Sequence, residues 1–394
     1  MMLWIGFSLA ILLLLVFSRR DLALGMGMAT LALALFTHSL GTFGQALWQT
    51  ISDPSVLLLT LVVGMIPLIG GVMEASGEMD RLVANLRIGI RPFLALGPGL
   101  LGMLPMPGGA LLSAPLVEQG AGHAPADVKA AANVWFRHVL LLIYPLGPDL
   151  IASAKIADLE VYSVIPYLIP SFALSLILGY VFLLRRVSGK LKQPGAFSWV
   201  GLFIPLCIIL VAPVLDLVLK RAAPLPYTEI GTVVGVSASL FMGIVIGKIR
   251  LPQLGRIVRR AKPAKYMLII LAMFAFLNVF TSSGVPEQIG AMSLPPVVLC
   301  VVIGALLGVV TGRIQAPMSI IVPIYVTTYG AISAAGFAAT YFAIVLGYIL
   351  TPTHPCISVS LEYFQTSLGA YVRRMAIPTA TALLITLGIG LLIF

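Results

Sequence analysis

The sequence predicts an all-α polytopic membrane protein built from two inverted repeats, each with five transmembrane helices and one re-entrant hairpin. Three observations lead to this prediction. The chain of 394 residues is 60% hydrophobic and only 10% charged, with a mean hydropathy of +1.08, which a water-soluble domain does not tolerate. Proline and glycine interrupt two of the hydrophobic stretches, and the same proline pattern occurs in both halves of the chain.

Ten hydrophobic runs are long enough to cross a bilayer, which takes about 20 helical residues. They are expected at 3–18, 22–38, 55–75, 131–156, 162–184, 198–218, 228–247, 265–283, 337–361 and 372–393. Two short amphipathic segments, 79–87 and 286–289, are expected to lie in the plane of the interface.

The two interrupted stretches, 92–118 and 295–326, are predicted to be re-entrant hairpins. The first contains Pro105, Pro107 and the pair Gly108-Gly109, and the second contains Gly312-Arg-Ile-Gln315. Proline removes a backbone donor and glycine loosens the backbone, so a continuous helix is disfavoured. Irregular backbone at membrane depth is tolerated only inside protein or beside a watery cavity.

The distribution of Lys and Arg gives the orientation. Of the 24 such residues, only Lys155, Lys220 and Arg221 fall in segments assigned to the outside, and only Arg137 and Arg313 fall within the membrane. The others lie in loops assigned to the cytoplasm, which is the positive-inside pattern rather than a nucleic-acid-binding surface. We expect a multi-pass protein of the plasma (inner) membrane with both termini outside. We interpret the first span as a retained transmembrane helix rather than a signal peptide.

The halves match each other at prolines. Pro145-x-x-Pro148 corresponds to Pro352-x-x-Pro355, Pro115 to Pro323, and Pro170 to Pro378, so the offset is 207 or 208 in each case. Five crossings per half is an odd number, so the second copy has the opposite orientation. This predicts inverted repeats over 1–190 and 196–394, with a binding site where the broken segments meet.

Breaking a helix frees carbonyls at one half-helix end and amides at the other, which suit a cation such as Na⁺ and a substrate anion respectively. The expected coupling-ion site lies near Asp149 and takes its ligands from the following residues: Asp149, Pro105, Met106, Pro145, Gly147, Thr351 and Ser358. Alternatively, each proline is only a packing kink. Asp149 could ligate Na⁺, carry a coupling proton or cap a half-helix.

Arg313 is the most informative single residue, because a charge at a hairpin tip within the membrane is costly unless it is compensated. Its guanidinium could bind a carboxylate or phosphate through two hydrogen bonds. It could instead pair with Asp149 or reach water. The full set expected to contact substrate is Arg313, Gly108, Gly109, Gln315, Ser113, Ser319, Thr353 and His354.

The remaining polar residues have ordinary interpretations as well. The serines and threonines are also common packing residues between membrane helices, and His354 could be either a titrating group or a hydrogen-bonding residue of the interior. Arg137 is interpreted as snorkelling to the interface. The three cysteines, Cys207, Cys300 and Cys356, are interpreted as small buried hydrophobes, with no disulfide or metal site.

The hairpin Pro105-Met-Pro-Gly-Gly-Ala-Leu-Leu-Ser-Ala-Pro115, the ten-span map and the Pro-x-x-Pro spans resemble the prokaryotic membrane family "domain of unknown function 401" over essentially the whole chain. That family is grouped in the ion transporter superfamily with gluconate permeases and divalent-anion/sodium symporters. The resemblance implies a homodimer and an elevator mechanism. It also implies scaffold helices at 1–75 and 198–283, and a moving transport domain formed by the hairpins with helices 131–184 and 337–393. The Ser-Asn-Thr hairpin tips of the sodium–dicarboxylate relatives are replaced here by Met106–Gly109 and Gly312–Gln315.

We therefore expect a symporter that moves a small organic anion, with a carboxylate as the favoured class, by alternating access driven by Na⁺ or H⁺. The alternative is a translocase (flippase) for a phosphate-bearing lipid carrier. No cofactor beyond the coupling ion is expected. An enzyme is not expected, because the sequence shows no nucleophile–base pair, zinc spacing or nucleotide-binding loop.

Overall fold

The computed structural model describes residues 2–104, 109–121, 123–188 and 196–394, and in these residues all regular structure is helical. The first half contains α1 (Met2–Ser18), α2 (Leu22–Thr37), α3 (Leu40–Ser52), α4 (Pro54–Ser76), α5 (Glu78–Ala84), α6 (Ile90–Gly102), α7 (Gly109–Ala121), α8 (Ala126–Val139) with the 3₁₀ turn Leu140–Leu142, α9 (Pro148–Ile156) and α10 (Val161–Gly179) with the π turn Tyr180–Leu184.

The second half contains α11 (Trp199–Ala222), α12 (Glu229–Ile246), α13 (Leu251–Ala261), α14 (Pro263–Thr281), α15 (Val285–Gly290), the π segment Val298–Ile303 continuing into α16 (Gly304–Thr311), α17 (Gln315–Tyr329), α18 (Ala334–Tyr348), α19 (Pro355–Tyr363) and α20 (Leu368–Ile393). The order of elements is therefore the same in both halves: two helices, a short helix, a long helix, another short helix, a helical hairpin, a broken helix pair and a last long helix.

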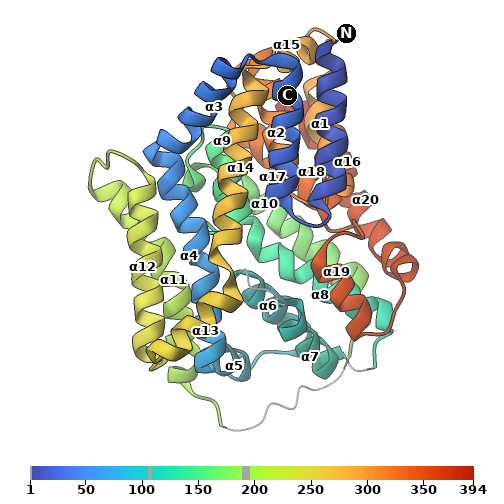
Figure 1. Cartoon of the computed structure of the whole chain (residues 1–394). Helices are drawn as coiled ribbons and strands as arrows, with labels where there is room; N and C mark the ends of the chain where they lie inside the picture. The colour runs from blue at the N-terminus through green and yellow to red at the C-terminus, as the bar shows by residue number, and fades with distance from the viewer. Residues whose placement is uncertain (1, 105–108, 122, 189–195) are drawn as a thin grey trace.

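Several contacts between the two halves are reciprocal, so that each has an equivalent contact with the halves exchanged. The second hairpin helix of each half packs on the second broken-pair helix of the other half: α7 lies on α19 and α17 lies on α9. The long helices exchange partners in the same way, because α2 packs on α14 while α4 packs on α12. Both chain ends lie at the end of the molecule that carries α15, whereas α5 and α13 lie at the opposite end (Figure 1).

Local backbone chemistry explains where the short helices begin. A left-handed glycine separates α4 from α5 at Gly77 (φ 77°), and another precedes α15 at Gly284 (φ 78°). Glycine adopts this conformation without steric cost. At the start of α4, the Asp53 carboxylate accepts a hydrogen bond from the Ser55 amide at 2.8 Å, and Pro54 occupies the first turn, both of which favour helix initiation there.

Small residues hold each hairpin against the broken pair of its own half. A Cβ atom added to Gly102 of α6 would meet the backbone carbonyl of Arg137 in α8, and one added to Gly347 of α18 would meet that of Ala305 in α16. Glycine therefore lets these helix backbones approach closely, as is usual between membrane helices.

The expected spans correspond closely to observed helices. Among the described residues, six helices are long and apolar enough to cross a membrane, and shorter apolar helices include α1, α2 and α18. The runs 131–156 and 337–361 are each divided into two helices at the predicted Pro-x-x-Pro breaks. Two helices were not predicted, α3 and α13. Helix α13 is amphipathic. At its start, Gln253 Oε1 accepts a hydrogen bond from the backbone N–H of Arg250 at 2.8 Å, and Lys262, which follows its last residue, has a left-handed conformation.

Candidate functional site

The broken elements of both halves meet around one cavity of about 410 Å³. Four helices begin at its wall: α7 at Gly109, α9 at Pro148, α17 at Gln315 and α19 at Pro355. No side chain caps the starts of α9, α17 or α19 with a hydrogen bond. Because the first amides of a helix have no partner within it and carry the positive end of the helix dipole, such starts attract anions.

Arg137 lies in the wall of this cavity and does not reach the interface. Its side chain is buried, and Nη1 donates to the backbone carbonyl of Gly109 at 2.9 Å. This hydrogen bond joins α8 to the start of α7 and places a positive charge beside the first hairpin. The snorkelling interpretation of Arg137 was therefore wrong, because the close contact between Gly102 and α8 holds the residue against the hairpin.

Arg313 lies between α16 and α17, at the tip of the second hairpin, and is half-buried in the cavity wall. Its backbone N–H donates to Thr311 Oγ1 at 3.3 Å. Within the described ranges, its guanidinium forms no hydrogen bond and no ion pair. Asp149 lines the same cavity and is close enough for its carboxyl to interact electrostatically with Arg313. The alternative of a direct Arg313–Asp149 ion pair is thus not realised in this structure.

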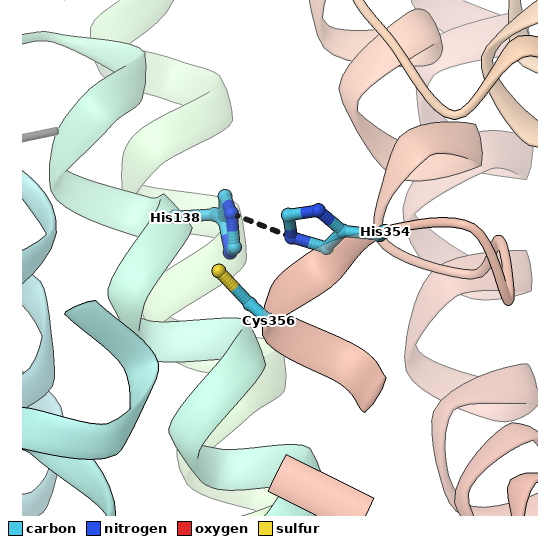
Figure 2. Close-up of side chains that lie close together, drawn as sticks. All are labelled: His138, His354 and Cys356. Atoms are coloured by element: carbon cyan, nitrogen blue, oxygen red, sulfur yellow. Dashed lines mark hydrogen bonds between the residues drawn. The ribbon is translucent and has the colours of Figure 1, made fainter. Parts of the chain in front are cut away.

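Two histidines and a cysteine form a second cluster on the cavity wall, shown in Figure 2. His138 comes from α8, His354 immediately precedes α19, and Cys356 lies in its first turn. The Nε2 atoms of the two rings are 3.0 Å apart. The candidate ligand atoms of the three residues all lie within 4.8 Å of one another.

The structure brings together six of the residues expected to form the site. These line the cavity: Gly109, Gly147, Asp149, Arg313, Gln315 and His354. The other described candidates do not line it: Ser113, Ser319, Pro145, Thr351, Thr353 and Ser358. Three more, Pro105, Met106 and Gly108, lie outside the described residues.

Four of the hydroxyl candidates have local partners instead. Ser113 donates to Ala110 O at 3.3 Å and Ser319 to Ala316 O at 2.9 Å, both within their own helices. Thr351 and Thr353 are hydrogen-bonded to each other at 3.0 Å. These contacts agree with the packing interpretation of the hydroxyl residues.

The cavity extends toward the junction of α13 and α14, where Lys262 and Lys265 line it. Lys265 Nζ lies 3.5 Å from a carboxylate oxygen of Asp21, at the start of α2. This end of the cavity therefore lies next to basic residues that the sequence assigns to the cytoplasm.

Sequence reasoning missed Arg137, His138 and Cys356 as site residues. A signal for the first two was present, since an ionisable pair inside an otherwise apolar span is by default a functional candidate. Cys356 gave no signal of its own, because a single cysteine in an apolar segment is typical of a packing residue.

The fold is similar to that of a solved transporter. The crystal structure of the YdaH transporter of Alcanivorax borkumensis matches with a TM-score of 0.58 and 19% sequence identity, and the match covers 90% of this chain and 87% of that one. No curated protein matches the sequence of this chain.

The apolar helices and this likeness identify the chain as a helical membrane protein with a transporter fold. A family model described as "Protein of unknown function (DUF401)" matches residues 2–393, so the chain belongs to the DUF401 family.

Proposed function

We propose that the protein is a secondary active transporter that moves a small organic anion, with a carboxylate as the favoured class, across the plasma membrane. One observation carries this proposal: four helix starts and two arginines surround a single cavity of about 410 Å³. Each feature favours negative charge. The cavity is within the range of about 300–1,000 Å³ typical of small-molecule sites.

Arg313 is assigned the principal contact with the anion. Its guanidinium has no protein partner in the described structure, so it can donate two hydrogen bonds to a carboxylate. Arg137 is assigned a supporting part, because one of its nitrogens is already engaged by Gly109. Gln315 adds an amide side chain at the start of α17.

Alternating access is supported by the repeated order of elements and by the exchanged packing of α7, α9, α17 and α19. The equivalent short helices α5 and α15 lie at opposite ends of the molecule (Figure 1), which agrees with an inverted repeat. With the expected orientation, the end of the cavity at Lys262 and Lys265 lies toward the cytoplasm, and we therefore assign the structure to an inward-facing state.

We assign the coupling ion to the neighbourhood of Asp149. Asp149 is a carboxylate on the cavity wall, two residues after Gly147, whose backbone also lines the cavity, and it can take either Na⁺ or a proton. The elevator mechanism, the homodimer and membership of the ion transporter superfamily belong to the same proposal and rest on the resemblance described above.

The proposal is tested by the thermal stability of the purified protein across a panel of carboxylates and other anions, each with Na⁺, with K⁺ and at two pH values. A ligand that binds only the folded state raises the unfolding midpoint. We expect one class of carboxylate to raise it, and Na⁺ or low pH to enlarge the shift. In Arg313→Ala the anion-dependent shift should disappear.

Arg259→Ala is the matched control, because Arg259 is an exposed arginine on α13, away from the cavity. It should keep the full shift. A carboxylate shift that survives Arg313→Ala would contradict the assigned contact but leave anion transport standing. The transport proposal itself is contradicted if no soluble anion shifts the wild-type midpoint and none is taken up by proteoliposomes.

A further inference from the structure

The cluster of His138, His354 and Cys356 lies in the cavity wall but has no part in the proposed anion contact. The two histidines are 7% and 2% exposed, so both rings are removed from solvent. One residue comes from the first half of the chain and two come from the second, and the side chains converge on one point (Figure 2).

The hydrogen bonds determine which ring nitrogen of His138 carries a proton. His138 Nδ1 lies 2.6 Å from the carbonyl oxygen of Val134. A carbonyl only accepts, so Nδ1 is the protonated nitrogen. In the neutral ring, Nε2 then presents its lone pair to His354 Nε2 at 3.0 Å. A histidine whose far N–H is held by a backbone carbonyl is the usual arrangement of a metal ligand.

His354 has a second buried ring nitrogen, which the hydrogen bond to His138 does not use. If its Nε2 carries the proton donated to His138, its Nδ1 is an unprotonated, buried nitrogen. That Nδ1 has no hydrogen-bond partner among the described residues. Because no hydrogen bond fixes Nδ1, the proton of the neutral ring can lie there instead, which leaves the lone pair of Nε2 free for an ion.

We propose that His138 Nε2, His354 Nε2 and Cys356 Sγ bind a zinc-like divalent transition-metal ion, with a fourth position open to the cavity. Two imidazoles and one thiolate suit such an ion. Around a tetrahedral ion with bonds of about 2.0–2.3 Å, neighbouring ligand atoms lie roughly 3.3–3.6 Å apart. The two Nε2 atoms, which are 3.0 Å apart, therefore need to separate by a few tenths of an ångström, and the sulfur, which lies within 4.8 Å of the ring nitrogens, needs to come to roughly 3.6 Å from each.

Binding of the metal ion changes the protonation of Cys356 and His354. The Cys356 thiol loses its proton to solvent as the sulfur–metal bond forms, and the proton on His354 Nε2 is replaced by one on Nδ1. One proton is released for each ion bound, and both rings stay neutral.

The positive charges near the cluster lower its affinity for a metal ion but do not prevent binding. Arg137 and Arg313 both act electrostatically on His354, which disfavours an added cation. The Cys356 thiolate offsets one of these charges and Asp149 the other. We therefore expect weaker binding than in closed structural zinc sites. Because α8 and α19 belong to different halves, the ion would cross-link the halves beside the cavity.

The test is a titration of the purified, metal-free full chain with Co²⁺, whose thiolate complexes have a charge-transfer absorption band. The double variant Cys207→Ser/Cys300→Ser leaves Cys356 as the only cysteine and should keep the band. Adding Cys356→Ser should remove it, and His354→Ala should weaken binding at least about 10-fold. A band that persists after Cys356→Ser would overturn the site, as would a wild type that binds neither Co²⁺ nor Zn²⁺.

Alkylation provides a second measurement if Cys356→Ser does not fold. In the Cys207→Ser/Cys300→Ser background, Zn²⁺ should slow alkylation of Cys356, and His138→Asn should remove this protection. Equal rates with and without Zn²⁺ would contradict the site. The metal site and the anion site can be separated by repeating the carboxylate panel with a chelator, since the anion contact at Arg313 does not require the ion.

Discussion

The half-helices α9 and α19 occupy equivalent places in the two halves but present different chemistry to the cavity. Each begins with a proline, Pro148 or Pro355, and has no side-chain cap. The next residue is Asp149 in α9 and Cys356 in α19. Arg313 from the second half acts on Asp149, whereas Arg137 from the first half acts on Cys356.

This comparison distinguishes the backbone arrangement, which is alike in the two halves, from the side chains at the cavity, which differ. The prolines and glycines fix the same backbone frame in both halves, so the unpaired amides of both half-helices reach the cavity. The single position after each proline then gives each half its own chemistry, an oxygen ligand in one and a sulfur ligand in the other. The two halves therefore share the order of their elements but differ in the side chains that they present to the cavity.

We expect the largest effect on stability from substitutions at closely packed glycines. These substitutions also test whether the helix backbones pack in the same way in both halves. Gly102→Ala and Gly347→Ala each bring a Cβ against a backbone carbonyl, of Arg137 and Ala305 respectively. We expect each to lower the free energy of unfolding by about 3 kcal/mol, as overpacking against rigid backbone does. Denaturant unfolding in detergent measures this.

Gly388→Ala is the matched control, since a Cβ at this exposed position of α20 meets nothing within 4 Å. It should be neutral or stabilise the helix by up to about 1 kcal/mol. A large loss at Gly102 with none at Gly347 would show that the two hairpins are not packed equivalently.

The two arginines should respond in opposite directions when each is replaced by Met. Arg137→Met removes a buried, charge-assisted hydrogen bond to Gly109, and we expect a loss of about 2 kcal/mol in the free energy of unfolding. Arg313→Met removes a half-buried charge without a direct partner, so the ligand-free protein should be unchanged or more stable. The thermal midpoint without added anion distinguishes these outcomes. Equal destabilisation by both variants would contradict the division into a positioning arginine and a binding arginine.

Much of the frame could be predicted from sequence, because it depends on local backbone chemistry. Proline and glycine define the breaks before α9 and α19, and hydropathy defines the spans, so these elements lie where they were expected. Helices α3 and α13 were missed because their amphipathic pattern is short and lies in segments assigned to loops. Helix α13 is rich in arginine, which the topology argument counted only as cytoplasmic charge.

The site was harder to predict, because its residues meet only in three dimensions. Asp149, Arg313 and His354 were found since each is polar within an apolar, broken segment. His138 and Cys356 lie 218 positions apart in the chain, and their meeting depends on the packing of α8 against α19. Ser113 and Ser319 do not line the cavity, and sequence does not show that their hydroxyls bond within their own helices.

A smaller effect concerns the far ends of α9 and α19. Lys155 at the end of α9 pairs with Glu229 of α12 at 3.0 Å and donates to Ser55 of α4 at 2.6 Å. Glu362, near the end of α19, forms no ion pair among the described residues. Because Glu229 is buried, we expect Lys155→Met to cost about 1–2 kcal/mol in stability.

Glu362→Gln should have no effect on the thermal midpoint, and this is the control for Lys155→Met. In the proposed elevator mechanism, the Lys155–Glu229 pair links the moving α9 to the scaffold. Lys155→Met should therefore also change the rate of transport, which uptake into proteoliposomes measures. An unchanged rate together with an unchanged midpoint would show that the pair contributes to neither.

The smallest expected effect is a pH dependence at the joint between the halves. His38, which follows α2, is hydrogen-bonded through Nε2 to Ser282, which follows α14, at 2.9 Å. Partial burial lowers the pKa of His38 below its usual value of 6.5. The unfolded chain therefore binds a proton more readily than the folded protein as the pH falls through 6.5, so this contribution to stability is present above that pH and is lost below it.

We expect His38→Gln to flatten the fall in thermal midpoint between about pH 7.5 and pH 5 only slightly, because His38 is only partly buried. The difference between wild type and variant isolates this residue from the other titrating groups. A steeper slope in His38→Gln than in wild type would reverse the sign argued here and would mean that the charged ring is favoured at the joint.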